Sequence, residues 1–413
     1  MKRSMVAMVF LFSVVLSARG AWAIWDYGAV NSGYVLGSVT GHSISVPAAH
    51  SYNSAGNTNG ATYVGVGNYN VTFPGLAIPI YAADGPVGGD VQVTAVGTAA
   101  RCKVNSWTAN GTTGIVGVNV RCYSLSGNPI ESSFRASFIS RTNSFDSDGS
   151  RIPFQEGAYV WAYQQSSSVY SATGAFTWNS ALGAVYITPH SAGTVGTYTV
   201  QFVGQIGGYD FTTVPTDPCS GYPSYNGGTF QVTAFGTGHA YCKAGNTFRD
   251  WNDTYVDVFC FNGSNGSPID SMFDLVYDTM SPNALKDSAF TFDDQPTTSP
   301  YNPSWDTYTA DIVPRTDDAY CPYYEPGATT IIRNSTGKYS VFFPGITIGN
   351  TSLFHSSAYG SGPETCGNAG ASDYTYLGVP GLLLGVNCVS FSGTPVDTEF
   401  MVSYAADGVI GIN

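Results

Sequence analysis

Three stretches of the chain alternate between apolar and polar residues in the same way, at residues 68–75, 197–204 and 338–345. In each stretch a tyrosine, a valine and a phenylalanine occupy every second position, and a glycine follows. Alternation with a period of two buries one face of a β-strand and leaves the other in water. The pattern therefore predicts three equivalent half-buried strands.

A second matched stretch follows each of these strands, at residues 91–98, 230–237 and, more loosely, 354–361. Each of these stretches ends in a glycine followed by threonine or serine, which indicates a turn or a bulge. The same elements thus return in the same order, and self-similarity at a long period decides the architecture. We interpret the chain as three copies of one β unit.

Each unit continues with two cysteines placed symmetrically about a turn-like centre, at residues 112, 251 and 377. A hairpin centred at each of these residues places the two cysteines opposite one another. The second cysteine shares its parity with valine or leucine on the returning strand, so the bridge is predicted on the buried face. Closing a loop of about 20 residues stabilises the fold by roughly 3 kcal/mol. The predicted disulfides are Cys102–Cys122, Cys242–Cys260 and Cys366–Cys388.

Every hairpin leads to a Gly-x-Pro-x-acid turn and a last strand, at residues 127–134, 266–273 and 393–400. No segment holds an apolar stripe of helical period and length. Short strands, frequent Gly and Pro turns and no helices predict an all-β protein of three tandem antiparallel β-sandwich (Ig-like) domains, stabilised by disulfides. The expected division is residues 1–23 as signal peptide, then sandwiches at 24–142, 150–280 and 285–413.

Cys219 and Cys321 stand outside this pattern, in insertions of the second and third units. Our hypothesis is that they pair and join those two units. Eight cysteines allow 105 connectivities, and only the symmetry of the units favours this one.

The N-terminus has the features of a secretory signal. Lys2 and Arg3 precede an apolar run at residues 5–16, and Ala21-Trp22-Ala23 forms a small-x-small cleavage site. That run is shorter than the roughly 20 residues that span a bilayer. Together with the cysteines, this predicts a secreted or cell-surface protein without a membrane span after cleavage.

Charge is sparse, at 10% of residues, and the formal net charge is −13. A surface this acidic repels nucleic acid and anionic lipid headgroups. The expected partner is therefore an unknown protein or glycan.

Catalytic motifs give little support to an enzyme. The five histidines occupy no repeated position, and phosphate-loop, dinucleotide-binding and Gly-x-Ser-x-Gly patterns are absent from the sequence. A glycosidase needs two facing carboxylates. Acidic residues are numerous enough for this, so a secreted hydrolase with an acidic site between units stays an alternative.

Calcium is the one metal that the sequence points to. Ser144, Asp146 and Asp148 alternate before Gly149, as in the first half of an EF-hand loop, and Glu156 lies one residue beyond the place of the bidentate glutamate. A calcium ion there would stiffen a linker. The alternative is a solvated turn with no metal and no other cofactor.

Aromatic residues recur within the predicted cysteine hairpins. Trp107 and Trp251 lie in the first two, where the third has Tyr374 and Tyr376. Exposed aromatics in equivalent loops would suit stacking on sugar rings. The alternative is that they pack across the hairpin or cover the end of the sheet.

The chain resembles a group of uncharacterised secreted bacterial β-repeat proteins. Their sequence motifs are Gly-x-Tyr-x-Val-x-Phe-Pro-Gly, Val-x-Val-Thr-Ala-x-Gly, Cys-Lys and Gly-x-Pro-x-Asp-x-x-Phe. In this chain the matching residues are, in the same order, 67–75, 91–97, 102–103 and 127–134. The third copy departs by lacking a lysine after Cys366. No activity comes with the resemblance, so it implies location and architecture only.

These observations together predict a secreted or cell-surface, non-catalytic repeat protein with a binding, adhesive or structural role. An array of carbohydrate-binding modules is a further alternative to that function, beside the secreted hydrolase. The matched positions are scaffold positions, so function is expected where the units differ.

Overall fold

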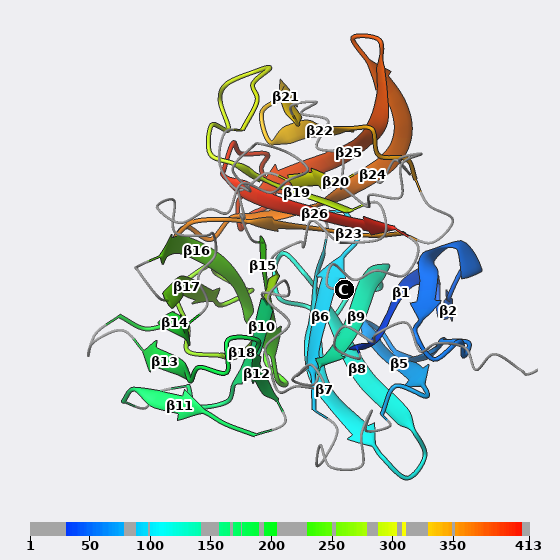
Figure 1. Ribbon diagram of the computed structural model, residues 1–413, viewed down its shortest axis with the longest axis vertical. Helices are drawn as coiled ribbons and strands as arrows, with labels where there is room; N and C mark the ends of the chain where they lie inside the picture. The colour runs from blue at the N-terminus through cyan, green and yellow to red at the C-terminus, as the bar shows by residue number, and fades with distance from the viewer. Residues whose placement is uncertain are drawn as a thin grey trace, which may run out of the picture.

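The computed structural model describes residues 30–77, 88–97, 100–141, 157–165, 168–174, 176–189, 194–204, 229–249, 253–278, 288–303, 308–310, 329–348 and 352–406. We call residues 30–141 segment I, residues 157–278 segment II and residues 288–406 segment III. Figure 1 shows segment I in blue and cyan, segment II in green, and segment III in yellow to red, grouped around a common centre.

The described chain is all β apart from one short 3₁₀ helix, η1 (Ala48–His50). Segment I contains β1 (Val30–Thr40), β2 (Ser43–Ser45), β3 (Ser51–Asn53), β4 (Gly60–Gly65), β5 (Asn68–Pro74), β6 (Asp90–Ala95), β7 (Ala100–Asn110), β8 (Ile115–Ser124) and β9 (Phe134–Arg141). Segment II contains β10 (Gly157–Ala162), β11 (Tyr170–Ala172), β12 (Thr177–Asn179), β13 (Val185–Pro189), β14 (Thr197–Val203), β15 (Thr229–Phe235), β16 (Tyr241–Arg249), β17 (Asp253–Phe261) and β18 (Met272–Asp278). Segment III contains β19 (Ser288–Asp293), β20 (Tyr308–Ala310), β21 (Thr330–Ser335), β22 (Lys338–Pro344), β23 (Ser352–Ala358), β24 (Thr365–Tyr376), β25 (Val379–Val389) and β26 (Phe400–Ala406).

The predicted alternation is confirmed on the strands that carry it. The tyrosine, valine and phenylalanine of β5, β14 and β22 are all buried, and each set belongs to an apolar core of its own segment. The three predicted disulfides are confirmed as well. They join residues paired in register on β7 and β8, β16 and β17, and β24 and β25.

The sheets formed by the described residues are predominantly antiparallel. Four of them lie within one segment: β2-β1-β9-β6 with β3 paired to β1, β11-β13-β14-β17-β16, β20-β19-β26-β23, and β21-β22-β25-β24. The fifth has eight strands in the order β12-β10-β18-β15-β7-β8-β5-β4 and runs from segment II into segment I through a parallel contact of β15 with β7. The three tandem immunoglobulin-like sandwiches are not confirmed as separate domains, because this mixed sheet crosses the boundary between the first two.

A glycine immediately before each of the strands β5, β14 and β22 explains much of the sequence motif that recurs in the three segments. These glycines adopt positive φ, and each carbonyl accepts the N–H of the second cysteine of its hairpin, at 2.7–2.8 Å. The same cysteine's carbonyl accepts an N–H from the Gly-x-Pro-x-acid turn, at 3.0–3.2 Å. The turn is therefore tied to the hairpin in all three segments. The glycines are Gly67, Gly196 and Gly337.

The segments are joined by hydrogen bonds that run in a closed cycle. A glycine with positive φ follows each of the strands β6, β15 and β23. Its N–H donates to a backbone carbonyl of another segment. That carbonyl always belongs to the residue two positions after the first cysteine of the disulfide hairpin. Segment I donates to III, III to II and II to I. The bonds run from Gly97 to Asn368 (3.1 Å), from Gly360 to Ala244 (3.3 Å) and from Gly236 to Val104 (3.0 Å).

Among the described residues, no helix has the length and apolar character that a bilayer crossing requires. The signal peptide, the linker acids and the two extra cysteines lie outside the described residues. They are residues 1–23, Asp146, Asp148, Glu156, Cys219 and Cys321.

Candidate functional site

An arginine stands where the three disulfide hairpins meet. Arg101 precedes the first cysteine of its hairpin, and its guanidinium donates to three backbone carbonyls, at 3.2–3.3 Å. Each acceptor is the third residue after the second cysteine of a different hairpin, so one side chain contacts all three segments. The guanidinium also lies over the ring of Tyr241, 4.1 Å from its centroid, which adds a cation–π contact. The acceptors are Leu125, Gly263 and Phe391.

A lysine follows the first cysteine in two of the hairpins and is almost completely buried in both. Lys103 donates to the carbonyl of Gly238, at 2.9 Å, and so joins segment I to segment II. Lys243 contacts the carbonyl of Tyr359 at 3.4 Å and the carboxylate of Glu364 at 3.5 Å, and so joins segment II to segment III. Burial lowers the pKa of each ammonium to about 8, because a low-dielectric surrounding disfavours the charged form.

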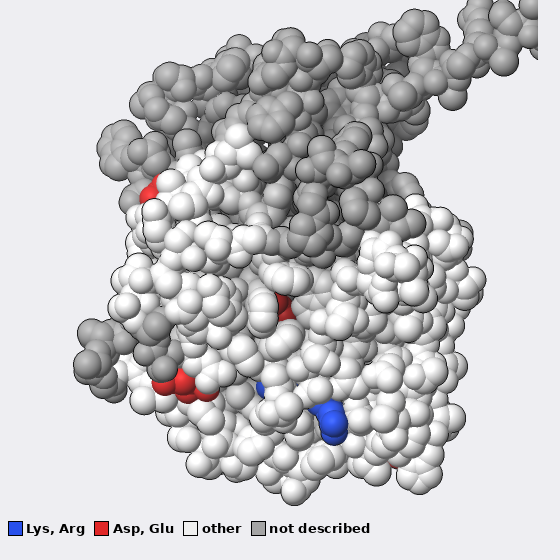
Figure 2. Space-filling view, turned by 90° about the horizontal axis from the view of Figure 1, so that it is seen from below, with Lys and Arg blue, Asp and Glu red and all other residues white. Residues whose placement is uncertain are grey.

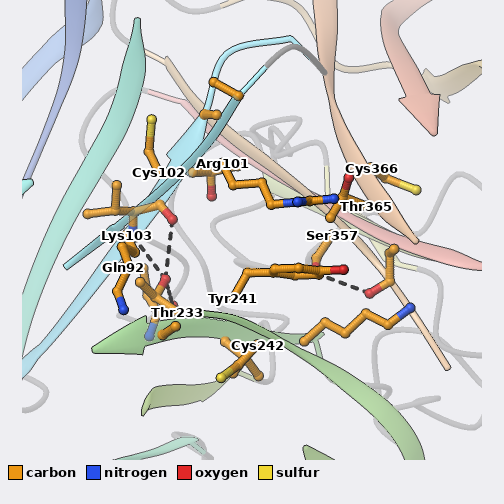
Figure 3. Close-up of a pocket in the computed structure, with 18 of the residues that line it drawn as sticks. Gln92, Arg101, Cys102, Lys103, Thr233, Tyr241, Cys242, Ser357, Thr365 and Cys366 are labelled. Atoms are coloured by element: carbon orange, nitrogen blue, oxygen red, sulfur yellow. Dashed lines mark hydrogen bonds between the residues drawn. The ribbon is translucent and has the colours of Figure 1, made fainter. Parts of the chain in front are cut away.

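These three cations line a cavity at the centre of the molecule, which we call the central cavity. Its volume is about 100 Å³, and strands of all three segments form its wall. Figure 3 shows Arg101 above Tyr241, with Thr365 and Ser357 approaching from segment III. Gln92 and Thr233 lie on the opposite side. The described part of the face seen from below carries few charged side chains (Figure 2).

A pair of buried carboxyl groups lies beside the cavity, between segments I and II. Gln92 donates to Asp90 at 2.6 Å and accepts from Thr233 at 2.8 Å, and Thr233 is paired in register with Asp274. One oxygen of Asp90 and both oxygens of Asp274 have no hydrogen-bond partner within the described part of the chain. Burial raises the pKa of Asp90 to about 7. It raises the pKa of Asp274 well above its ordinary value, and the nearby Asp90 adds to the rise.

Between segments I and III the contact is made by an arginine, an aromatic ring and a histidine, and not by a pair of carboxyl groups. Arg135 lies over the ring of Phe354, 3.9 Å from its centroid, and Thr94 and His355 share a hydrogen bond of 3.0 Å. Burial, with a smaller contribution from Arg135, lowers the pKa of His355 to about 3. The imidazole is therefore neutral near pH 7, and this contact does not titrate in that range.

The aromatic residues singled out from the sequence do not gather at one site. Trp107 packs edge-on against Phe138 and Phe176, at 5.7 and 5.2 Å between ring centroids. Tyr374 and Tyr376 lie at the far end of the β24–β25 hairpin, and Trp251 lies outside the described residues. Of the three that the structure describes, only the two tyrosines lie near each other, on β24.

The β24–β25 hairpin projects from segment III, at the top of Figure 1. Tyr376 pairs with Val379, so Leu377 and Gly378 form a two-residue turn. Both turn residues have positive φ, at 51° and 88°, as a type I′ turn requires. Leu377 is 88% exposed and is followed by a half-exposed Val379. The hairpin therefore ends in an apolar tip in water.

Partial signals for these features are present in the sequence. The recurrence of Cys-Lys marks Lys103 and Lys243, and the third hairpin has Gly367 there instead. Arg101 carries no such signal, because Tyr241 and Thr365 stand at the corresponding positions. Within the described residues, no group of three or more His, Cys, Asp or Glu side chains is placed to hold a metal ion.

Comparison with known proteins gives no match among protein-family models, curated proteins or solved structures. The function is therefore inferred from the residues and their geometry.

Proposed function

We propose that this chain is a secreted or cell-surface, non-catalytic recognition protein that binds a partner protein through the β24–β25 hairpin. Three copies of one immunoglobulin-like sandwich would close into a ring, and the hairpin would be the element presented to the outside. The three disulfides fit an oxidising compartment, and the signal-like N-terminus fits export.

The contacts at the centre favour a rigid scaffold. Arg101, the two buried lysines and the glycine N–H cycle all join one segment to another. Side chains buried in these contacts do not reach the surface of a partner protein. Recognition would then fall to elements that project from the scaffold, as the hairpin does (Figure 1).

The observation that carries the proposal is the conformation of Leu377. A residue with a side chain costs about 1 kcal/mol in the left-handed region, and two-residue hairpins prefer asparagine, aspartate or glycine there. At 88% exposure, Leu377 gains little from burial within its own chain. A conformational free-energy cost that no contact within the chain offsets points to a role in binding another molecule.

The chemistry of the tip favours a protein with an apolar pocket over a sugar. Leucine and valine side chains offer no polar group to a hydroxyl-rich ligand. Tyr376 packs against Phe342, with 5.5 Å between ring centroids, which covers part of its ring. Tyr374, half exposed, is the feature that the carbohydrate-binding alternative would use.

The hydrolase alternative requires acidic side chains of different segments in an open cleft. Asp90 and Asp274 do meet across segments I and II, but they are 1% and 0% exposed. A carboxyl group enclosed to this degree does not reach a substrate.

The test is the substitution L377N. Asparagine tolerates positive φ, so we expect the free energy of unfolding to rise by about 0.5–1 kcal/mol while partner binding weakens at least about tenfold, as for loss of an apolar anchor. Unfolding is measured in denaturant, and binding is measured by surface plasmon resonance against the extracellular fraction that wild-type protein retains.

The matched control is V169N, which removes another exposed apolar side chain, from segment II. It should leave retention unchanged. Binding by L377N at wild-type strength would contradict the proposal, whereas equal loss in both variants would indicate a non-specific apolar contact.

A further inference from the structure

We propose that the central cavity binds one small tetrahedral oxyanion, of the sulfate or phosphate class. This site is separate from the hairpin and does not depend on the role proposed for it.

The inference starts from the charges that line the cavity. Three cationic side chains, Arg101, Lys103 and Lys243, face it with a single carboxylate, Glu364. The whole chain has a formal net charge of −13, so cations are scarce, yet they collect in its interior. Arg101 is 8% exposed and each lysine 3%. Buried charges are stable only when they are paired or fully hydrogen-bonded.

The protein supplies only part of that pairing. An ammonium has three N–H donors, and within the described residues Lys103 uses one of them, on Gly238. Lys243 has two contacts at 3.4 and 3.5 Å, which are long for a charged donor. The Nε–H of Arg101 is fully buried and finds no acceptor in the described part of the chain.

Donors are therefore left over on each of the three cations. Backbone carbonyls meet some of the demand, but they carry no net charge. A single anion would accept from several of these donors and would also reduce the excess of positive charge.

The size and lining of the cavity define the kind of anion. A water molecule needs roughly 10–15 Å³ of such space, so a cavity of about 100 Å³ has room for an ion of five heavy atoms. The hydroxyl groups of Thr365 and Ser357 and the amide of Gln92 add neutral polar groups to the wall (Figure 3). A tetrahedral oxyanion accepts from several directions at once, which suits donors that come from three segments. A free inorganic ion of this class fits the space.

Glu364 supplies a sharp test, because it is the carboxylate among the residues that line the cavity. It lies 3.5 Å from Lys243, and its side chain is 26% exposed, so E364Q is expected to fold. The full chain is dialysed into chloride buffer and titrated with sodium sulfate and with inorganic phosphate by isothermal calorimetry, at ionic strength held constant with sodium chloride. Wild-type protein should bind one ion per chain with a saturable heat.

E364Q should bind the same ion about three- to tenfold more tightly, because a repulsive charge is removed. K243M should bind it at least about tenfold more weakly, as for loss of a charged hydrogen bond. K338M, which removes the exposed lysine at the start of β22, should bind like wild type. If K243M does not fold, E364Q against K338M still decides the matter.

The absence of a saturable heat with both ions in wild-type protein and E364Q would overturn the proposal. So would an affinity that is the same in wild type, E364Q and K243M. In either case the cations would serve only the backbone carbonyls between the segments.

Discussion

The substitution G196A is expected to destabilise the protein by about 3–5 kcal/mol, the range of the severest single substitutions. Gly196 has φ of +74°, and a Cβ on it would lie 2.5 Å from the carbonyl oxygen of Cys260 and 2.7 Å from the nitrogen of Ile269. Both neighbours are backbone atoms, so neither moves away as a flexible side chain would. The cost therefore combines left-handed strain with a steric overlap that only backbone displacement relieves.

That displacement would reach the core. The carbonyl of Gly196 accepts the N–H of Cys260 at 2.7 Å, and the carbonyl of Cys260 accepts the N–H of Ile269 at 3.0 Å. Separating these groups loosens the turn that leads to β18. We expect the denaturant midpoint to fall steeply when unfolding is followed by near-ultraviolet circular dichroism.

Gly174 provides the control, because it has φ of +96° but no atom within 4 Å of its ideal Cβ. The substitution G174A should cost only the conformational strain, about 1 kcal/mol. If both variants lose the same stability, the contact with the disulfide hairpin contributes nothing, and our explanation of the recurring glycine is wrong.

The second large effect is on the pH dependence of stability, through Asp90 and Asp274. Both carboxyl groups are buried between segments I and II, and three of their four oxygens have no hydrogen-bond partner within the described residues. Burial raises the pKa of Asp90 to about 7, and burial with the charge of Asp90 raises that of Asp274 in the same direction. The folded protein therefore holds protons that the unfolded chain releases near pH 4.

The sign follows from which state binds more protons. A raised folded pKa stabilises the protein fully below about pH 4, and that contribution is lost as the pH rises through about 7. Each such carboxyl lowers stability by up to about 1.4 kcal/mol per pH unit in this window. D274N removes one of them and the repulsion between the two. It should match wild type near pH 4 and become progressively more stable than wild type as the pH rises to 8.

The measurement is the free energy of unfolding of both proteins in denaturant at pH 4, 6 and 8. Using the difference between variant and wild type cancels the titration of other groups, such as His355. A constant difference for D274N would mean that this carboxyl is already ionised in the folded protein.

The sequence predicted local structure well, because local structure was encoded in side chains. Alternating apolar positions marked the strand of Tyr69, Val71 and Phe73 and its counterparts, and the spacing of cysteines about each turn located three disulfides. Both signals act within one segment. They require only that one face of a strand be buried and that two thiols be opposite each other.

The assembly of the segments was not predicted, because backbone groups carry much of it. The link from Gly236 to Val104 joins an N–H to a carbonyl, and every non-proline residue has both. Arg101 is decisive at the centre, but nothing in the sequence distinguished it from the Tyr241 and Thr365 that stand in its place elsewhere. The hairpin tyrosines were identified, whereas the exposed Leu377 beside them was not.

The closed cycle of glycine N–H bonds has a consequence for biosynthesis. While the chain emerges, segments I and II can form their mutual bond, but Gly97 and Ala244 stay without Asn368 and Gly360 until segment III arrives. During that interval each molecule has one N–H donor of this cycle, on Gly97, and one carbonyl acceptor, on Ala244, that still lack their partners in segment III. Head-to-tail contacts of this kind close into a ring when segment III of the same chain completes the cycle. They propagate into open polymers when segment III of another chain binds instead. Slow completion of the chain or a truncated third segment would thus favour exchange between neighbouring molecules, and dilution would favour the monomer.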